Sequence, residues 1–198
     1  MSAVRQLRNT TDSGSFGVDQ ELFEIVKERS FRRGHFVLSS GMESDHYFDL
    51  KPTMMCARGA SIAAEAFLNR INEAHVDFVG GLEMGAIPLI GAAAAVSFRE
   101  GRPIQTFFVR KAPKPHGTQK LVEGLAPDES LNGKRVLVVD DVATRGGSMM
   151  KAIEAVRAEG AIVDAALVLL DREEGAEAFL RERGIRLTSV LRASQFLS

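Results

Sequence analysis

VLVVDDVATRGGS, residues 136–148, is an apolar run that ends in two adjacent carboxylates, Asp140 and Asp141, and then a short polar turn. An amphipathic run from Met149 to Ala158 follows the turn. A continuous apolar run predicts a buried parallel strand, here over residues 135–140, and the spacing of apolar residues after the turn predicts a helix. The segment is therefore expected to bring two acids and a short loop to a helix N-terminus.

The turn between the strand and the helix has the composition of a phosphate site. Exposed backbone N–H groups and about half a positive charge from the helix dipole favour an anion at such a place. Gly146 and Gly147 lack the Cβ atoms that would keep a phosphate away, and Thr144 and Ser148 add hydroxyl donors. The two acids suit ribose hydroxyls or a metal ion, so a phosphorylated sugar is the expected ligand.

Other interpretations of this segment are a plain helix cap or one of the common nucleotide loops. An acid followed by a glycine turn can do no more than begin a helix, although two acids, a threonine, two glycines and a serine in succession favour a site. The segment lacks the Gly-Lys-Ser/Thr end of a P-loop and the glycine spacing of a dinucleotide fold.

The chain as a whole has the composition of an ordinary globular protein. It has 198 residues, 45% hydrophobic and 26% charged, with a net charge of −1. Nothing in this balance indicates nucleic acid or a membrane surface as a partner. One cysteine excludes an intrachain disulfide and agrees with a reducing compartment, and no segment approaches the roughly 20 apolar residues of a membrane span, so we expect a cytoplasmic protein.

Residues 1–18 are polar and are expected to be a mobile tail, and residues 19–198 to form one domain. Asp19 can cap a first helix from about residue 20 to 30. Alternating strands and helices imply an α/β fold with a mostly parallel sheet covered on both faces. The expected strands are 36–38, 46–50, 76–80, 104–109, 135–140, 165–170 and 186–191, and the further helices are 59–73, 86–99, 147–159 and 173–183.

Four of the predicted strand ends carry unusual chemistry. They are Gly80–Gly85, Arg110-Lys111, Asp140-Asp141 and Asp171-Arg172. Ligands of parallel α/β sheets bind beyond the carboxyl ends of the strands. Any one of these segments could be a surface loop, but four at corresponding ends indicate one crevice.

The long connection after the strand at 104–109 contains a cluster of cations. Arg110, Lys111, Lys114 and Lys120 are joined by His116, with prolines and a glycine that oppose regular structure. Long connections in compact domains are often functional loops. A solvated basic loop is the simple alternative, but beside a sugar-phosphate site a clamp for a polyanion is the better interpretation.

These segments together resemble the orotate phosphoribosyltransferases, which have the type I phosphoribosyltransferase fold. The stretch Asp140–Ser148 is similar to the phosphoribosyl pyrophosphate (PRPP) motif of that fold, and residues 110–117 are similar to the mobile catalytic loop of the orotate enzymes. FVLSSG and SDHYFD, residues 36–41 and 44–49, resemble their N-terminal hood, expected here mainly in residues 19–52 plus the C-terminal end. Leu170–Arg172 is similar to the strand end that supplies an orotate-binding arginine.

The resemblance implies transfer of ribose 5-phosphate from PRPP to orotate, which gives orotidine 5′-monophosphate and pyrophosphate in the biosynthesis of UMP. Asp140 and Asp141 would hold the ribose hydroxyls and stabilise positive charge on the sugar, and with Lys114 and His116 they are the expected catalytic residues. The implied PRPP-binding residues are Arg110, Lys111, Lys114, His116, Asp140, Asp141, Val142, Ala143, Thr144, Arg145, Gly146, Gly147, Ser148, Glu83, Met84 and Gly85.

The base would be recognised through its carboxylate, which uracil lacks. Arg172 can pair with a carboxylate in a fork, and Thr144, Tyr47 and Phe48 complete the implied orotate site. Strand alternation predicts that one of the two aromatic side chains points into the core instead.

Mg²⁺ is the implied cofactor, because the leaving pyrophosphate carries several negative charges. It would be carried mainly by PRPP and pyrophosphate, with no direct protein ligands expected. The resemblance also implies a homodimer in which the catalytic loop reaches the neighbouring subunit's site, with the two small molecules as the other partners.

The chain departs from the family pattern at three positions. Some members have lysine where Ser39 and Met84 stand, so those roles are not transferred to this chain. Arg145 occupies a turn position where a small residue or threonine is common, which leaves its role open.

Two alternatives remain open. A purine or uracil phosphoribosyltransferase would share the Asp140–Ser148 motif without needing the basic loop or the hood. A PRPP-responsive regulator would keep the fold without the chemistry, and it would usually carry a nucleic-acid-binding extension or basic face.

Overall fold

The core of the molecule is a six-stranded sheet whose strands run in the order β5-β4-β3-β6-β7-β8. The computed structural model describes residues 13–37, 43–71, 76–113 and 120–197. All neighbouring strands of this sheet are parallel except β4 and β5, which pair antiparallel. The strands are β3 (Phe78–Leu82), β4 (Gln105–Val109), β5 (Val122–Glu123), β6 (Val136–Ala143), β7 (Ala165–Asp171) and β8 (Arg186–Arg192).

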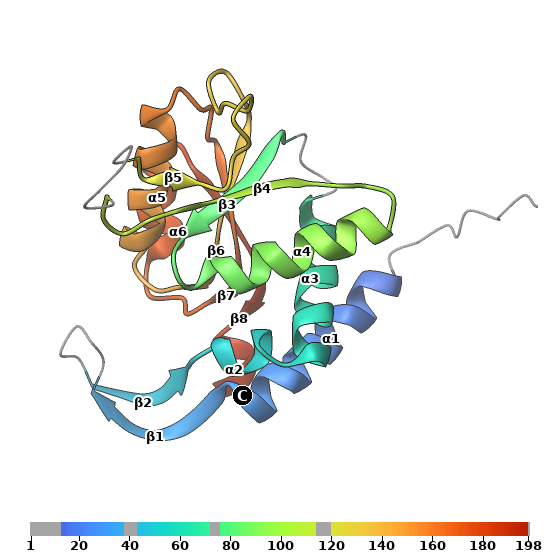
Figure 1. Cartoon of the computed structure of the whole chain (residues 1–198). Helices are drawn as coiled ribbons and strands as arrows, with labels where there is room; N and C mark the ends of the chain where they lie inside the picture. Colours follow the sequence, from blue (N-terminus) through green and yellow to red (C-terminus); the bar gives the residue numbers. More distant parts are fainter. Residues whose placement is uncertain (1–12, 38–42, 72–75, 114–119, 198) are drawn as a thin grey trace, which may run out of the picture.

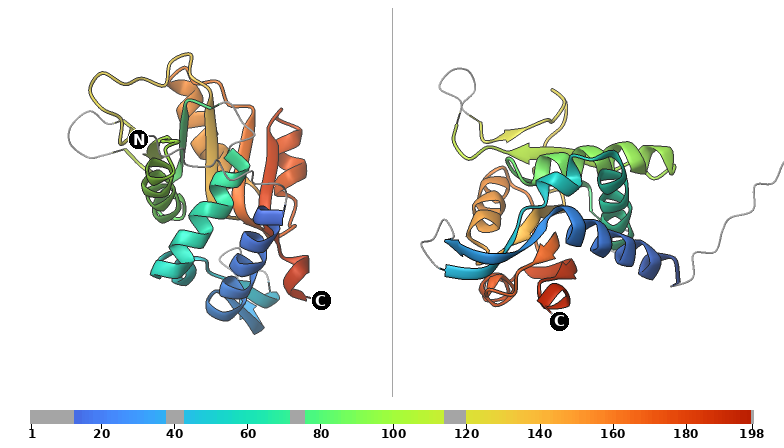
Figure 2. Two further views of the ribbon diagram at one scale, coloured as in Figure 1. Left: turned by 90° about the vertical axis from the view of Figure 1, so that its right-hand side faces the viewer. Right: turned by 90° about the horizontal axis from the view of Figure 1, so that it is seen from below.

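Helices cover both faces of the sheet (Figures 1 and 2). Successive residues of β6 point to opposite faces: Leu137 and Val139 pack in one core with α3 and α4, whereas Val136 and Val138 pack in the other with α5 and α6. This double burial explains why β6 is a continuous apolar run. The helices are α3 (Ala57–Ile71), α4 (Ala86–Arg99), α5 (Gly147–Ala158) and α6 (Ala176–Arg181).

A smaller unit, the hood, lies beyond one end of the sheet (Figure 1). It consists of helix α1 (Ser13–Arg29), the antiparallel hairpin of β1 (Phe31–Val37) and β2 (Glu43–Phe48), and the short helices α2 (Lys51–Met54) and α7 (Ser194–Leu197). The ring of Phe196, near the C-terminus, lies 4.4 to 5.6 Å from the rings of Phe23, Phe31 and Phe48. Aromatic packing therefore holds the last helix against the first hairpin.

The predicted α/β fold with a mostly parallel sheet is confirmed, but several boundaries differ. Helix α1 begins at Ser13, inside the segment expected to be a tail, and Asp19 is not its cap but pairs with Arg70 of α3. Strand β6 continues to Ala143, so both acids lie inside the strand and not after it. β1 begins at Phe31, earlier than expected, and neither α2 nor β5 was predicted.

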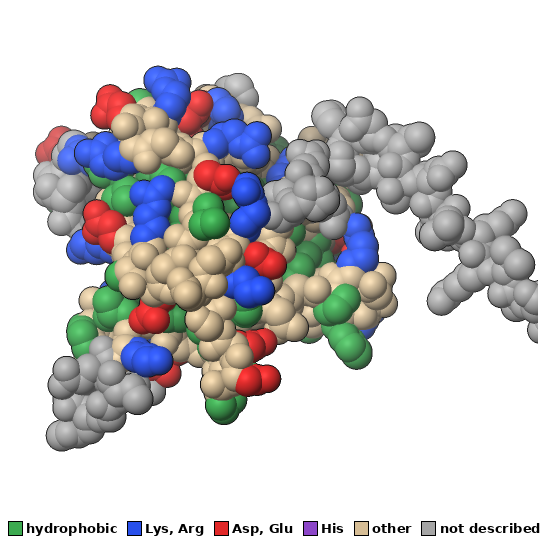
Figure 3. All heavy atoms as spheres, turned by 90° about the horizontal axis from the view of Figure 1, so that it is seen from above, with side chains coloured by type: hydrophobic (Ala, Val, Ile, Leu, Met, Phe, Trp, Pro, Cys, Tyr) green, Lys and Arg blue, Asp and Glu red, His purple; other side chains and the backbone are tan. Residues whose placement is uncertain are grey.

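The surface carries charges of both signs. On the face shown in Figure 3, Lys and Arg side chains alternate with Asp and Glu, which agrees with the net charge of −1. Within the described ranges, no helix is long and apolar enough to cross a membrane.

Candidate active site

The four predicted strand ends lie side by side. β4, β3, β6 and β7 are consecutive neighbours in the sheet and all run parallel, so their carboxyl ends meet at one edge. The four segments therefore follow neighbouring strand ends, as the sequence indicates, and their joining in one crevice stays a prediction. This edge faces the hood (Figure 1).

Two buried acids stand at the centre of the site. Asp140 and Asp141 are 8% and 9% exposed, and each carboxylate accepts a backbone N–H bond, Asp140 Oδ1 from Asp141 at 3.0 Å and Asp141 Oδ1 from Val142 at 2.9 Å. Burial, together with the neighbouring Asp141 carboxylate, raises the pKa of the Asp140 carboxyl well above its usual range. The pair is thus held close at a cost that a ligand with hydroxyl donors or positive charge can offset.

Gly85 allows the loop after β3 to lie in close contact with Asp140 and Asp141. A Cβ atom on Gly85, just before α4, would overlap the carboxylates of both Asp140 and Asp141. The backbone at the start of α4 therefore lies directly against the acids. Any larger residue at position 85 would push the two segments apart.

The turn after β6 presents a row of accessible groups to solvent. Thr144, Arg145, Gly147 and Ser148 are exposed, while Gly146 is buried and has a φ of +81°. A Cβ on Gly146 would come within 2.9 Å of the Phe179 ring, whereas one on Gly147 would meet open space. Only Gly147 therefore fits the predicted role of leaving room for a phosphate; Gly146 is needed for the left-handed turn and for contact with α6.

The basic segment, residues 110–120, begins beside the loop that follows β3. The backbone N–H of Lys111 donates to Glu83 Oε1 at 2.8 Å, and the Glu83 N–H donates to the Val109 carbonyl at 2.8 Å. Met84 is exposed. Lys114 and His116 lie outside the described residues, as does Ser39. The structure thus joins the base of the predicted catalytic loop, Arg110 and Lys111, to the loop of Glu83–Gly85.

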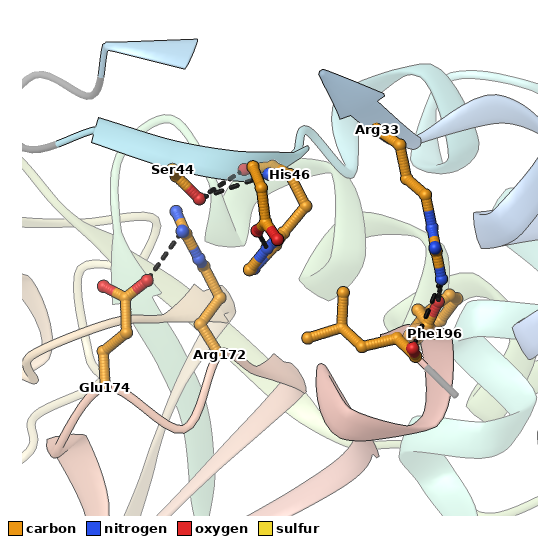
Figure 4. A network of polar contacts seen from close by, with 8 residues as sticks. Arg33, Ser44, His46, Arg172, Glu174 and Phe196 are labelled. Carbon is orange, nitrogen blue, oxygen red and sulfur yellow. Dashed lines mark hydrogen bonds and ion pairs between the residues drawn. The ribbon is translucent and has the colours of Figure 1, made fainter. Parts of the chain in front are cut away.

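Arg172 follows β7 and points toward the hood (Figure 4). Its side chain is 6% exposed, and its backbone N–H donates to the Ala143 carbonyl at 2.9 Å, which links it to the end of β6. Phe48 is buried and packs on Phe31, whereas Tyr47 is 41% exposed. The expectation that one of these two rings points into the core is confirmed.

The structure adds Lys151 and Glu174, which the sequence does not indicate. A cavity of about 390 Å³ between the ends of β3 and β4 and helix α5 is lined in part by Arg110, Lys111 and Lys151. Glu174 contacts Arg172, and Ser44 and His46 face it from β2. The only sequence signal for Glu174 is its i, i+2 spacing from Arg172, which does not mark a site by itself. Ser44 and His46 lie in the SDHYFD stretch that resembles the hood.

Asp140 and Asp141 are also candidate donors to a metal ion. Among the described residues, no three His, Cys, Asp or Glu side chains form a cluster that could hold one. Mg²⁺ commonly binds through one or two carboxylates together with substrate phosphates. Asp140 and Asp141 supply oxygen donors of the right kind, and they fit an ion that arrives with a polyphosphate.

A mostly parallel sheet with a buried acid pair and a glycine-containing turn after its central strand is the arrangement expected of a phosphoribosyltransferase. The phosphoribosyl transferase domain family matches residues 54–179, which include β3, β6, α5 and Arg172.

Comparison with known proteins narrows the class. The chain is 51% identical over 176 residues to an orotate phosphoribosyltransferase of Bradyrhizobium diazoefficiens, which covers 89% of this chain and 94% of that protein. The orotate phosphoribosyltransferase of Mycobacterium tuberculosis, solved with Fe(III) dicitrate, matches with a TM-score of 0.77 and 36% identity over 90% of this chain and 98% of that one. The same enzyme solved with PRPP gives 0.74 and 32%, over 91% and 99%. The chain belongs to the orotate phosphoribosyltransferase family, and it is a pentosyltransferase.

Proposed function

We propose that the crevice between the sheet and the hood transfers ribose 5-phosphate from PRPP to orotate, releasing pyrophosphate and orotidine 5′-monophosphate. One observation carries the proposal: a buried acid pair, an exposed phosphate-sized turn and a buried arginine meet at one sheet edge. Each matches the chemistry of one part of the reactants, namely the ribose, the 5-phosphate and the carboxylate of the base.

The sheet end would hold the sugar phosphate. The turn from Thr144 to Ser148 offers backbone N–H groups at the start of α5, where the helix dipole favours an anion. Asp140 and Asp141 would accept hydrogen bonds from the ribose hydroxyls. As the bond to pyrophosphate breaks, positive charge grows on the sugar, and these carboxylates would stabilise it.

The basic segment would bind the pyrophosphate. Arg110 and Lys111 line the cavity beside α5 together with Ser148 of the turn, and Lys114 and His116 follow them in the chain. Glu83–Gly85 adds backbone groups beside the same anion. Mg²⁺, bound mainly by PRPP and with Asp140 and Asp141 nearby, would neutralise further negative charge. Closure of this segment would keep water from the reactive sugar.

The base would lie between β7 and the hood. Arg172 offers a planar fork that suits the orotate carboxylate, with Thr144 and Tyr47 as further contacts. The burial of Phe48 favours a supporting role for its ring, behind the pocket wall. A base without a carboxylate would leave buried donors of the guanidinium without an acceptor, which would provide selectivity against uracil.

A homodimer that shares the basic segment across subunits is part of the proposal, and it rests on the family resemblance. Mixing a Lys114→Ala chain with an Asp141→Asn chain tests it. If the loop acts in the partner's site, the mixture regains activity, because one site of each hybrid dimer is intact. A cytoplasmic location also remains a prediction, based on the single cysteine.

The direct test follows orotate absorbance after PRPP and Mg²⁺ are added, with uracil, hypoxanthine and adenine in parallel. We expect turnover of orotate alone. Turnover of another base with none of orotate would assign the site to a different nucleobase. PRPP binding without turnover of any base would favour the regulator alternative.

A further inference from the structure

Arg172 has an unusual set of contacts for a buried cation. Its Nη2 lies 2.6 Å from Oε1 of Glu174, yet neither Nε nor Nη2 makes a hydrogen bond of normal geometry within the described part of the chain. The contact with Glu174 is therefore an ion pair that leaves the Nε–Nη2 edge without aligned acceptors. The guanidinium thus has its charge balanced through one contact at Nη2, while Nε and the second N–H of Nη2 have no aligned acceptor among the described residues.

Glu174 is well placed to hold Arg172 in this orientation. Its side chain is 26% exposed, so it is less buried than the arginine, and it belongs to a short loop that is fixed at several points. Besides the Arg172 hydrogen bond to Ala143, Ala176 N–H donates to the Thr144 carbonyl at 3.1 Å. The neighbouring Glu173 N–H donates to Asp171 Oδ1 at 2.9 Å.

The hood offers no competing acid to Arg172 among the residues described. Figure 4 shows the guanidinium pointing toward Ser44 and His46. Ser44 Oγ donates to the His46 carbonyl at 2.8 Å, and the Asp45 carboxylate, 92% exposed, lies 2.7 Å from Nδ1 of its neighbour His46. Glu174 is thus the one described ion-pair partner of Arg172.

We propose that Glu174 is a positioning residue that pre-orders Arg172, so that its free edge meets the carboxylate of the incoming base. The inference rests on the proposed function, since it assumes that Arg172 reads that carboxylate. Without Glu174, the ligand would itself have to order the long arginine side chain. The expected cost is a roughly two- to tenfold weaker binding of ligands that carry the carboxylate.

The test compares two nucleotides that differ only in that group, orotidine 5′-monophosphate and uridine 5′-monophosphate, by calorimetric titration. Glu174→Gln keeps the size of the side chain and removes its charge. We expect this variant to bind orotidine 5′-monophosphate more weakly and to bind uridine 5′-monophosphate with unchanged affinity. In steady-state assays the KM of orotate should rise, while kcat and the KM of PRPP stay near their original values. Glu174→Ala should do the same more strongly.

Glu177→Gln is the matched control. Glu177 lies on α6 near the same loop, but its ion-pair partner is the surface residue Arg192, at 4.0 Å, and not Arg172. This control variant should change neither affinity, and Tm measurements show whether each variant is folded. Equal weakening of both nucleotides, no change in either, or tighter binding of orotidine 5′-monophosphate by Glu174→Gln would each overturn the inference. If the original chain turns over orotate and prefers the orotidine nucleotide, the proposed function stands whatever Glu174 does.

Discussion

The proposed site has a phosphate end, at the turn after β6, and a base end, around Arg172 and the hood, and the two are built in opposite ways. The phosphate end comes from one continuous segment, β6 and the start of α5, whose residues lie in the middle of the sheet. The base end is assembled from β2, the loop after β7 and α7, with the Arg33 side chain bonded to the Phe196 carbonyl at 3.2 Å across 163 positions of the chain. The proposed site thus joins a phosphate end made from one segment of the chain to a base end assembled from several.

The largest expected effect tests whether the phosphate end can catalyse the transfer without the basic segment. Lys114→Ala should lower kcat by about 100-fold or more, because a cation that meets the leaving pyrophosphate is lost. Lys134→Ala is the control and should change kcat little, because Lys134 is exposed just before β6, at the opposite end of that strand from the acids. Near-normal turnover of Lys114→Ala at saturating PRPP and Mg²⁺ would remove this segment from the catalytic machinery.

The next effect separates the two ends directly. Arg172→Ala should raise the KM of orotate by roughly 10- to 100-fold, the range expected when a charge-assisted pair is lost, and the KM of PRPP far less. Arg192→Ala, at the exposed end of β8, serves as the control in steady-state assays. Equal changes in both KM values would mean that Arg172 does not belong to the base end alone.

Gly85 offers a smaller and more local effect at the phosphate end. Gly85→Ala places a methyl group against Asp140 and Asp141, so we expect the KM of PRPP to rise roughly tenfold as the acids are displaced. Gly91→Ala, on α4 where a Cβ meets open space, should keep activity and raise the free energy of unfolding by up to about 1 kcal/mol. Unchanged PRPP kinetics in Gly85→Ala would show that the acids tolerate movement.

The smallest effect concerns stability and pH. Because the pKa of Asp140 is raised in the folded state, the folded protein binds more protons there than the unfolded chain. The contribution of Asp140 to stability therefore falls as pH rises above the unfolded pKa of about 3.9 and levels off above the folded pKa. Asp140→Asn removes this titration, so its gain in unfolding free energy over the original chain should be larger at pH 8 than at pH 5.

Urea unfolding at the two pH values measures this difference, and activity assays on the same samples report the cost. We expect Asp140→Asn to be the more stable and the less active protein. A stability difference that does not change with pH would contradict the raised pKa.

The sequence predicts the two ends of the site unequally, for a physical reason. The strand, acids, glycines and helix of residues 136–158 are local, and a continuous apolar run followed by helical spacing of apolar residues is enough to place them. The sequence nevertheless predicts an end of β6 that is too early. The apolar pattern stops at the first acid, although the strand continues through both acids and buries them. The Arg172–Glu174 contact depends on side-chain directions that the pattern does not encode.

The hood shows the same limit. β1 is FRRGHFV, with four successive exposed residues after Phe31, so its pairing with β2 leaves little periodic signal. Helix α1 begins among serines and glycines that resemble a tail. Its stability comes from packing, such as Leu22 and Val26 in the core, and from the Asp19–Arg70 ion pair, all of which depend on distant parts of the chain.

The C-terminal helix also sets an order on how the molecule is made. Translation produces α1 and the hairpin first, whereas Phe196, the ring that packs against Phe23, Phe31 and Phe48, is made only after all six strands of the sheet. Domains form as they emerge, at about 5 to 20 residues per second. The sheet with its acid pair can therefore fold on the nascent chain before the hood is complete, because the hood needs α7, which follows β8. A chain cut before α7 would keep its sheet and lose the aromatic packing that supports the proposed base end.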